Sequence, residues 1–231
     1  MRRETFEIDV AQDPPGTVRA AWDLPARDAG GCVVVLAHGA GLPHDAAFMV
    51  GIGERLAAQG LPTLRFDYPY ATRMAREGRR FPPNPMPKLE AAHRRAVEVA
   101  RERFAGRPLL LAGKSMGGRV SSHLAAGGEE AAGCVLLGYP LHPPKKPENL
   151  RVEHFGGLKL PCLFLQGTRD ALAPLETLEA HLGAIPGPVT MHVIEGADHG
   201  FAVPKKLGRS EHEVLDELAA AIATFAAGRG Q

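Results

Sequence analysis

The chain has 231 residues, of which 45% are hydrophobic and 23% charged, and its formal net charge is +1. This balance is typical of a globular protein and gives no reason to expect nucleic acid or an anionic membrane as a partner. No apolar run reaches the length of a membrane span, and the first residues lack the apolar core of a signal peptide. We therefore expect a single cytoplasmic domain covering residues 1–231.

The first two predicted elements are strands. Residues 4–10 and 17–22 alternate between apolar and polar side chains, and residues 13–16 between them read Asp-Pro-Pro-Gly. Period-two alternation on both sides of a turn signal indicates an antiparallel pair at the edge of a sheet.

From residue 32 onward, predicted strands and helices alternate. The strands are short apolar runs at residues 32–37, 61–66, 107–112, 134–138, 160–167 and 189–194. The helices have apolar residues at helical spacing or clear start signals, at residues 45–59, 88–104, 116–126, 174–182 and after the capping box Ser210 to Glu213. This order predicts an α/β fold with a mainly parallel sheet between two helix layers.

The segment 71–87 is predicted to be an exposed loop with at most one helical turn. It contains four arginines, Arg73, Arg76, Arg79 and Arg80, followed by several prolines. Such a cluster is either a solvated surface or a site for an acidic group of a substrate or partner.

Three cysteines, Cys32, Cys134 and Cys162, each lie in an apolar run. An odd number in such positions indicates buried, reduced thiols and a reducing compartment. The ten histidines show no metal-ligand spacing, so we expect neither a metal nor another cofactor.

The segment around Ser115 is the candidate centre of the chemistry. Gly113-Lys-Ser115-Met-Gly117 follows a predicted strand and precedes a predicted helix, which is the pattern of a nucleophile elbow. An ordinary glycine-rich turn has the same sequence requirements. Gly113-Lys-Ser115 also ends like a phosphate-binding loop, but the upstream glycine of that motif is absent.

A serine nucleophile needs a base and an acid that orients the base. Asp170 follows the strand predicted at 160–167, and His199 follows the strand at 189–194. Because the carboxyl ends of parallel strands share one edge of a sheet, we expect Ser115, Asp170 and His199 to meet there. Asp170 as a helix N-cap and His199 as a surface histidine are the alternatives.

Three other carboxylates, Asp67, Glu195 and Asp198, compete with Asp170 for the role of the acid. Asp67 follows an earlier strand, and Glu195 and Asp198 are too close to His199 in sequence to orient it easily. We expect all three to make hydrogen bonds within loops.

The motif His38-Gly-Ala-Gly41 directly follows the strand predicted at 32–37. We expect the N–H groups of Met116 and Ala40 to form an oxyanion hole, and we expect His38 to brace the loop. A tight turn before a helix is the alternative. The pocket candidates are His38, Gly39, Gly41, Tyr139 and His142.

Four motifs together resemble the α/β-hydrolase superfamily. They are His38-Gly-Ala-Gly41, Gly113-Lys-Ser-Met-Gly-Gly-Arg119, Gly138-Tyr-Pro-Leu-His-Pro-Pro144 and Gly196-Ala-Asp-His-Gly200. Within the superfamily they are similar to a small, lidless, dienelactone-hydrolase-like branch, which includes the hydrolase-like region of a eukaryotic chromatin-complex subunit. The resemblance implies an eight-stranded, mostly parallel sheet and the triad Ser115–Asp170–His199. Dienelactone hydrolases have cysteine where this chain has Ser115.

These observations favour a serine hydrolase of small carboxylic esters or thioesters. The short, proline-rich segment between residues 138 and 160 leaves no room for a lipase-type lid, which favours small soluble substrates or a partner that covers the site. A non-catalytic binding module and an acyltransferase with the same triad are the alternatives. No nucleic acid or membrane is expected as a partner, and nothing indicates a protein partner.

Overall fold

A computed structural model describes residues 1–10, 16–28 and 30–229. In these ranges eight strands form one sheet in the order β1-β2-β4-β3-β5-β6-β7-β8. The strands are β1 Arg2–Asp9, β2 Thr17–Leu24, β3 Val33–Ala37, β4 Thr63–Phe66, β5 Leu109–Lys114, β6 Gly133–Leu137, β7 Cys162–Gly167 and β8 Val189–Ile194. The α-helices are α1 Ala47–Ala58, α2 Pro69–Glu77, α3 Met86–Arg103, α4 Met116–Ala126, α5 Leu175–Leu182 and α6 Glu211–Ala227.

The sheet is antiparallel only at its amino-terminal edge. β1 pairs with β2 and β2 pairs with β4 in antiparallel fashion, whereas all pairs from β4 to β8 are parallel. The central strands are buried on both faces, as continuous apolar runs require. The predicted fold class and the edge hairpin are therefore confirmed, although most of the turn predicted at 13–16 lies outside the described residues.

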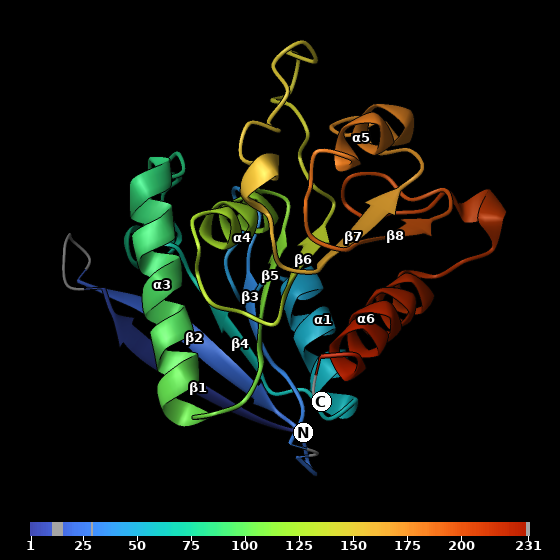
Figure 1. Ribbon diagram of the computed structural model, residues 1–231. Helices are drawn as coiled ribbons and strands as arrows, with labels where there is room; N and C mark the ends of the chain where they lie inside the picture. The colour runs from blue at the N-terminus through green and yellow to red at the C-terminus, as the bar shows by residue number, and fades with distance from the viewer. Residues whose placement is uncertain (11–15, 29, 230–231) are drawn as a thin grey trace.

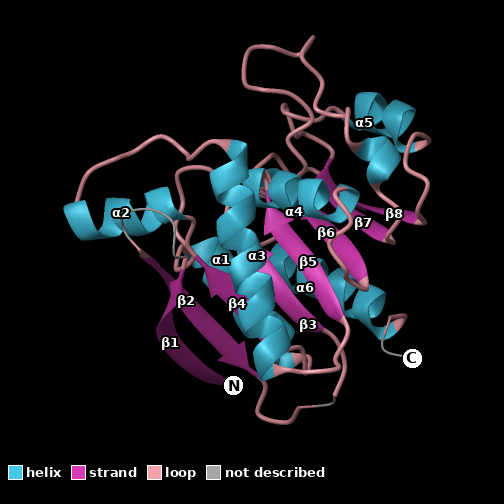
Figure 2. Ribbon diagram, turned by 60° about the vertical axis from the view of Figure 1, so that its left-hand side comes forward, coloured by secondary structure: helices cyan, strands magenta, loops and turns pink. Residues whose placement is uncertain are grey.

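Helices cover both faces of the sheet (Figures 1 and 2). On one face α1 and α6 pack against each other and against the even-numbered residues of β3 and β5. On the other face α3 and α4 pack together over the odd-numbered residues, and Leu178 of α5 joins the same core. This layering leaves the carboxyl ends of the parallel strands free for loops.

The predicted boundaries of α4 and β8 agree with the structure, and the other elements that were predicted shift by a few residues. The capping box is present: Ser210 Oγ accepts from the N–H of Glu213, and the Glu213 carboxylate accepts from the N–H of Ser210 at 2.7 Å.

The prediction of an exposed loop over 71–87 is wrong in its first half, because Pro69–Glu77 is the nine-residue helix α2. Pro69 sits at the first helical position, where its missing N–H costs nothing, and Gly78 ends the helix in the left-handed conformation. Tyr70 and Ala71 bury the inner face of α2 in the core. The many prolines and arginines obscured these start and stop signals.

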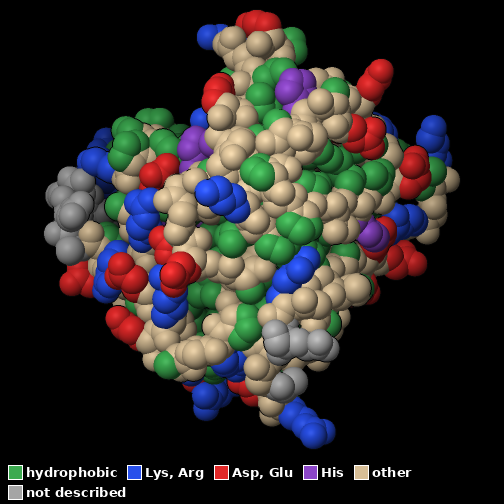
Figure 3. Space-filling model, in the orientation of Figure 1, with side chains coloured by type: hydrophobic (Ala, Val, Ile, Leu, Met, Phe, Trp, Pro, Cys, Tyr) green, Lys and Arg blue, Asp and Glu red, His purple; other side chains and the backbone are tan. Residues whose placement is uncertain are grey.

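The arginines of this segment are largely paired within the protein. Arg73 and Arg79 both bind Glu77, at 2.5 and 2.9 Å, and Arg76 binds Glu7 at 2.8 Å. Basic and acidic side chains are also interspersed over the face seen in Figure 3. Three of the four arginines thus have acidic partners within the protein.

The segment between β6 and β7 rises beyond the carboxyl edge of the sheet (Figure 1, yellow). It contains one short 3-10 helix, Phe155–Gly157, and is otherwise irregular. Among the described residues, no helix is long and apolar enough to cross a membrane.

Candidate active site

Ser115 stands at a sharp turn between β5 and α4. Its backbone angles are φ 51° and ψ −116°, a conformation that costs an L-residue about 1–3 kcal/mol. The neighbouring strand β6 holds the turn, because the N–H of Ser115 donates to Leu137 O at 2.9 Å. The side chain does not cap α4, so its hydroxyl is available to other groups.

The two glycines of the elbow are required by close packing. A Cβ on Gly113 would lie 2.2 Å from the backbone carbon of Gly117, and a Cβ on Gly117 would lie 2.4 Å from the carbonyl oxygen of Ala37. The first turn of α4 therefore lies directly against the ends of β5 and β3. An ordinary glycine-rich turn between a strand and a helix would need the same glycines, so the nucleophilic role of Ser115 stays a prediction at this point.

Ser115, His199 and Asp170 form a continuous chain of hydrogen bonds. His199 Nε2 lies 2.8 Å from Ser115 Oγ, and His199 Nδ1 lies 2.8 Å from Asp170 Oδ2. Because a carboxylate only accepts, Nδ1 carries the proton and Nε2 is left as the acceptor for the serine hydroxyl. The three residues follow β5, β8 and β7, so the strand ends bring them together as expected.

Asp170 is almost fully buried and is held from two further sides. Its Oδ1 accepts from the N–H of Leu172 at 2.8 Å, and its Oδ2 accepts from Gln166 Nε2 at 2.6 Å. The residue that caps α5 is Pro174, which removes the alternative of Asp170 as a helix N-cap. Gln166 was missed in the sequence, where a glutamine inside an apolar strand was the available signal.

The carboxylate that His199 Nδ1 contacts is Asp170, and the three competing carboxylates have other surroundings. Asp67 accepts from His44 Nδ1 at 2.9 Å and from Arg19 at 2.8 Å, and Asp198 accepts from the N–H groups of Gly200 and Ala202. Although burial alone raises the pKa of Asp67, its hydrogen bond and charge interaction with His44 lower this pKa to about 2. Glu195 is exposed.

The loop after β3 approaches the serine closely. A Cβ on Gly39 would lie 3.5 Å from Ser115 Cβ, which is an ordinary van der Waals distance, so the backbone of this loop lies directly beside the elbow. Within the described chain, the N–H groups of Ala40 and Met116 donate to no protein acceptor. Both are therefore available to an oxyanion, and their role in binding one stays a prediction.

His38 supports this loop from inside the protein. The N–H of Tyr68 donates to His38 Nε2 at 3.0 Å, so Nδ1 is the protonated nitrogen and donates to Gly39 O at 2.8 Å. Burial lowers the pKa of His38, which keeps the ring neutral. Tyr70 adds a brace that the sequence did not reveal, because its hydroxyl accepts from the N–H of Gly41 at 3.1 Å.

The pocket candidates divide into interior and surface positions. His38 and Tyr139 are 0% exposed, and the Tyr139 hydroxyl donates to Arg151 O at 2.6 Å. Both residues support loops and present no surface to a ligand. His142 is 6% exposed, Gly39 is buried and Gly41 is exposed.

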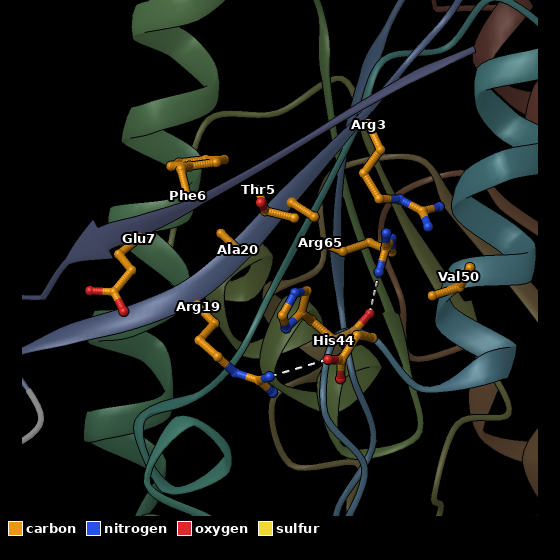
Figure 4. A pocket seen from close by; sticks show the side chains of 11 residues that line it. Arg3, Thr5, Phe6, Glu7, Arg19, Ala20, His44, Val50 and Arg65 are labelled. Carbon is orange, nitrogen blue, oxygen red and sulfur yellow. Dashed lines mark hydrogen bonds and ion pairs between the residues drawn. The ribbon is translucent and has the colours of Figure 1, made fainter. Parts of the chain in front are cut away.

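A separate hollow of about 380 Å³ lies between β1, β2 and the start of α1 (Figure 4), and Ser115 is not among the residues that line it. Its basic groups are already paired: Arg3 and Arg65 bind Asp23, and Arg19 binds Asp67 and Asp45. In the described part of the chain, no group of three or more His, Cys, Asp or Glu residues is arranged to hold a metal ion.

A mostly parallel sheet that places a serine elbow, a histidine and an aspartate at one edge defines an α/β-hydrolase architecture. The family model described as alpha/beta hydrolase domain matches residues 30–227. The chain therefore belongs to the alpha/beta hydrolase family.

Solved structures share this fold over their whole length. An alpha-beta serine hydrolase homologue from Coxiella burnetii is 21% identical, with a TM-score of 0.74 and coverage of 97% of this chain and 98% of that one. A dienelactone hydrolase from Anabaena variabilis is 19% identical, with a TM-score of 0.76 and coverage of 100% and 99%. A serine hydrolase without a lid from Xanthomonas campestris is 17% identical, with a TM-score of 0.70 and coverage of 98% and 96%. The resemblance to a lidless branch is thereby confirmed at the level of the fold.

Proposed function

We propose that this protein is a serine hydrolase that cleaves small carboxylic esters or thioesters through an acyl-enzyme. The observation that carries the proposal is the 2.8 Å contact between Ser115 Oγ and His199 Nε2, continued to Asp170. A serine hydroxyl is a weak nucleophile unless an adjacent base removes its proton, and this chain places an imidazole nitrogen at hydrogen-bond distance.

In the proposed first half-reaction, Ser115 Oγ attacks the substrate carbonyl carbon while its proton passes to His199 Nε2. Asp170 stabilises the imidazolium that forms and holds the ring through Nδ1. The N–H groups of Met116 and Ala40 donate to the oxyanion. His199 then returns the proton to the departing alcohol or thiol, which leaves an ester of Ser115.

In the second half-reaction, water attacks the acyl-enzyme. His199 takes a proton from the water and returns it to Ser115 Oγ, which releases a carboxylic acid and restores the starting state. An acceptor alcohol in place of water gives acyl transfer with the same residues. The dienelactone hydrolase of similar fold is named for a cyclic ester, which supports an ester as the substrate class.

The test compares the wild-type protein with Ser115→Ala on p-nitrophenyl acetate and on a small panel of esters, thioesters and amides. We expect Ser115→Ala to lose at least about 10³-fold in kcat, because no other group replaces the nucleophile. Covalent labelling by a fluorophosphonate probe at Ser115 is the second measurement. A folded wild-type protein that neither labels nor turns over any ester is instead a binding module.

A further inference from the structure

Lys114, the residue before the candidate nucleophile, is a buried lysine next to the catalytic chain. It is 6% exposed, and Nζ donates a hydrogen bond to the backbone oxygen of His199. The ammonium also lies 5.1 Å from the centroid of the Phe201 ring and 5.9 Å from that of Phe48. Within the described chain its hydrogen-bond partner is a neutral carbonyl, and no carboxylate reaches ion-pair distance.

This placement is costly for stability. Burial lowers the pKa of Lys114 to about 8, although the nearby charges of Asp170 and Asp198 act in the opposite direction. If Lys114 only filled space here, an apolar side chain of similar length would make the folded protein more stable. A buried, weakly compensated charge beside reactive groups therefore points to a role in the site.

The turn that carries His199 is closed by hydrogen bonds among its own residues, including those that Asp198 Oδ1 accepts from the N–H groups of Gly200 and Ala202. Asp198 and Ala202 close it through a backbone hydrogen bond of 3.0 Å, and Phe201 adopts a left-handed φ of 67° within it. The Phe201 ring stacks on Phe48 of α1 at 5.7 Å. Lys114 links this turn to β5, the strand from which Ser115 itself projects.

The same lysine also lies close to Asp170. A Cβ on Gly138 would lie 3.0 Å from Lys114 Nζ and 3.6 Å from Asp170 Oδ2, so the ammonium and the carboxylate flank one glycine. The stem of Lys114 packs beneath Gly39, whose Cβ would lie 3.7 Å from Lys114 Cγ. One side chain thus contacts or adjoins every loop that supplies a group to the proposed reaction.

We propose that Lys114 is a positioning residue: its ammonium holds the backbone oxygen of His199 and fixes the imidazole within reach of Ser115. This inference rests on the proposed function for its kinetic consequence. It also assigns a role to the lysine of Gly113-Lys-Ser115, since the nucleophile-elbow pattern does not require a lysine at that position.

The first experiment measures kcat and KM for Lys114→Met on a soluble ester, together with the thermal midpoint. We expect kcat to fall about 10- to 100-fold and KM to change less than about threefold, because the base is displaced while the substrate surface is intact. The thermal midpoint is expected to stay equal or to rise, since a buried charge is removed. Lys159→Met removes an exposed lysine as the matched control and is expected to retain full activity.

Lys114→Arg keeps both the charge and the N–H donors, and we expect it to recover at least part of the lost kcat. Undiminished kcat in Lys114→Met overturns the proposal. So does a loss of activity that follows a lowered thermal midpoint and that arginine does not relieve, because that pattern describes a lysine needed only for folding.

The second experiment does not depend on turnover. Amide hydrogen exchange at Asp198 and Phe201 is compared between Ser115→Ala and the double variant Ser115→Ala/Lys114→Met. We expect exchange in this turn to be at least about tenfold faster in the double variant, with the central β5 amides unchanged. Unchanged exchange in the turn refutes the positioning role even if Ser115 proves catalytic. Faster exchange in a protein without esterase activity refutes the proposed function alone.

Discussion

Gln166 Nε2 donates to Asp170 Oδ2 at 2.6 Å, and this is the same carboxylate oxygen that accepts from His199 Nδ1 at 2.8 Å. The other end of the amide accepts from the N–H of Tyr139 at 3.0 Å. Gln166 therefore ties the strand end after β6 to the acid of the proposed triad. Because the amide is fully buried, water cannot replace the hydrogen bonds that it makes to Tyr139 and Asp170.

Replacing this amide tests its contribution. Gln166→Leu leaves the Tyr139 N–H and one site on Asp170 without a partner, so we expect a loss of about 1–3 kcal/mol in unfolding free energy. We also expect kcat to fall about tenfold, because Asp170 is freer to turn away from His199. Chemical denaturation and ester hydrolysis measure the two effects, and a variant with both values unchanged contradicts the prediction.

Substituting Asp170 and Asp67 one at a time tests which of these two buried aspartates is the acid of the triad. Asp170→Asn is expected to lower kcat by about 10⁴-fold, because an amide no longer selects the imidazole tautomer that accepts from Ser115. Asp67→Asn breaks the pairing with His44 and Arg19, so we expect a loss of about 3–5 kcal/mol in stability. The kcat per folded molecule is expected to persist in Asp67→Asn. A large loss of kcat in Asp67→Asn together with a retained kcat in Asp170→Asn would assign the role of the acid to Asp67.

The elbow glycines give a prediction about folding. Gly117→Ala places a methyl group 2.4 Å from the carbonyl oxygen of Ala37, and we expect it to cost about 3 kcal/mol or more. Gly156→Ala is the matched control, because a Cβ there meets no atom within 4 Å. We expect the control to differ from wild type by no more than about 0.5 kcal/mol in a urea titration. Equal stabilities of the two variants count against the packing described for the elbow.

Acid stability is expected to depend on Asp67. The pKa of this carboxyl is lowered from 3.8 to about 2 in the folded protein, so the ionised form is favoured by folding. Its contribution of about 2 kcal/mol is present above about pH 4 and is lost as the pH falls through about 2. Urea titrations between these pH values measure the loss. Asp67→Asn, which has no carboxyl to protonate, is expected to show a correspondingly flatter pH dependence.

The sequence by itself determined most of the strands and helices and the position of the elbow, because their signals are local. Continuous apolar runs predicted the parallel strands, helical spacing predicted α3 and α6, and the glycines around Ser115 indicated a tight elbow. The positions of Asp170 and His199 after strands were sufficient to predict their meeting with Ser115, since a parallel sheet brings its strand ends to one edge.

Tertiary structure decided what depends on neighbours far apart in sequence. Helix α2 forms because Tyr70 and Ala71 pack into the core. The many arginines and prolines of this segment do not predict that packing. Gln166 and Lys114 acquire their partners only when β6, β7 and the His199 turn pack against one another. A buried polar side chain is satisfied by groups that folding brings to it, so its role is fixed by packing and not by its own segment.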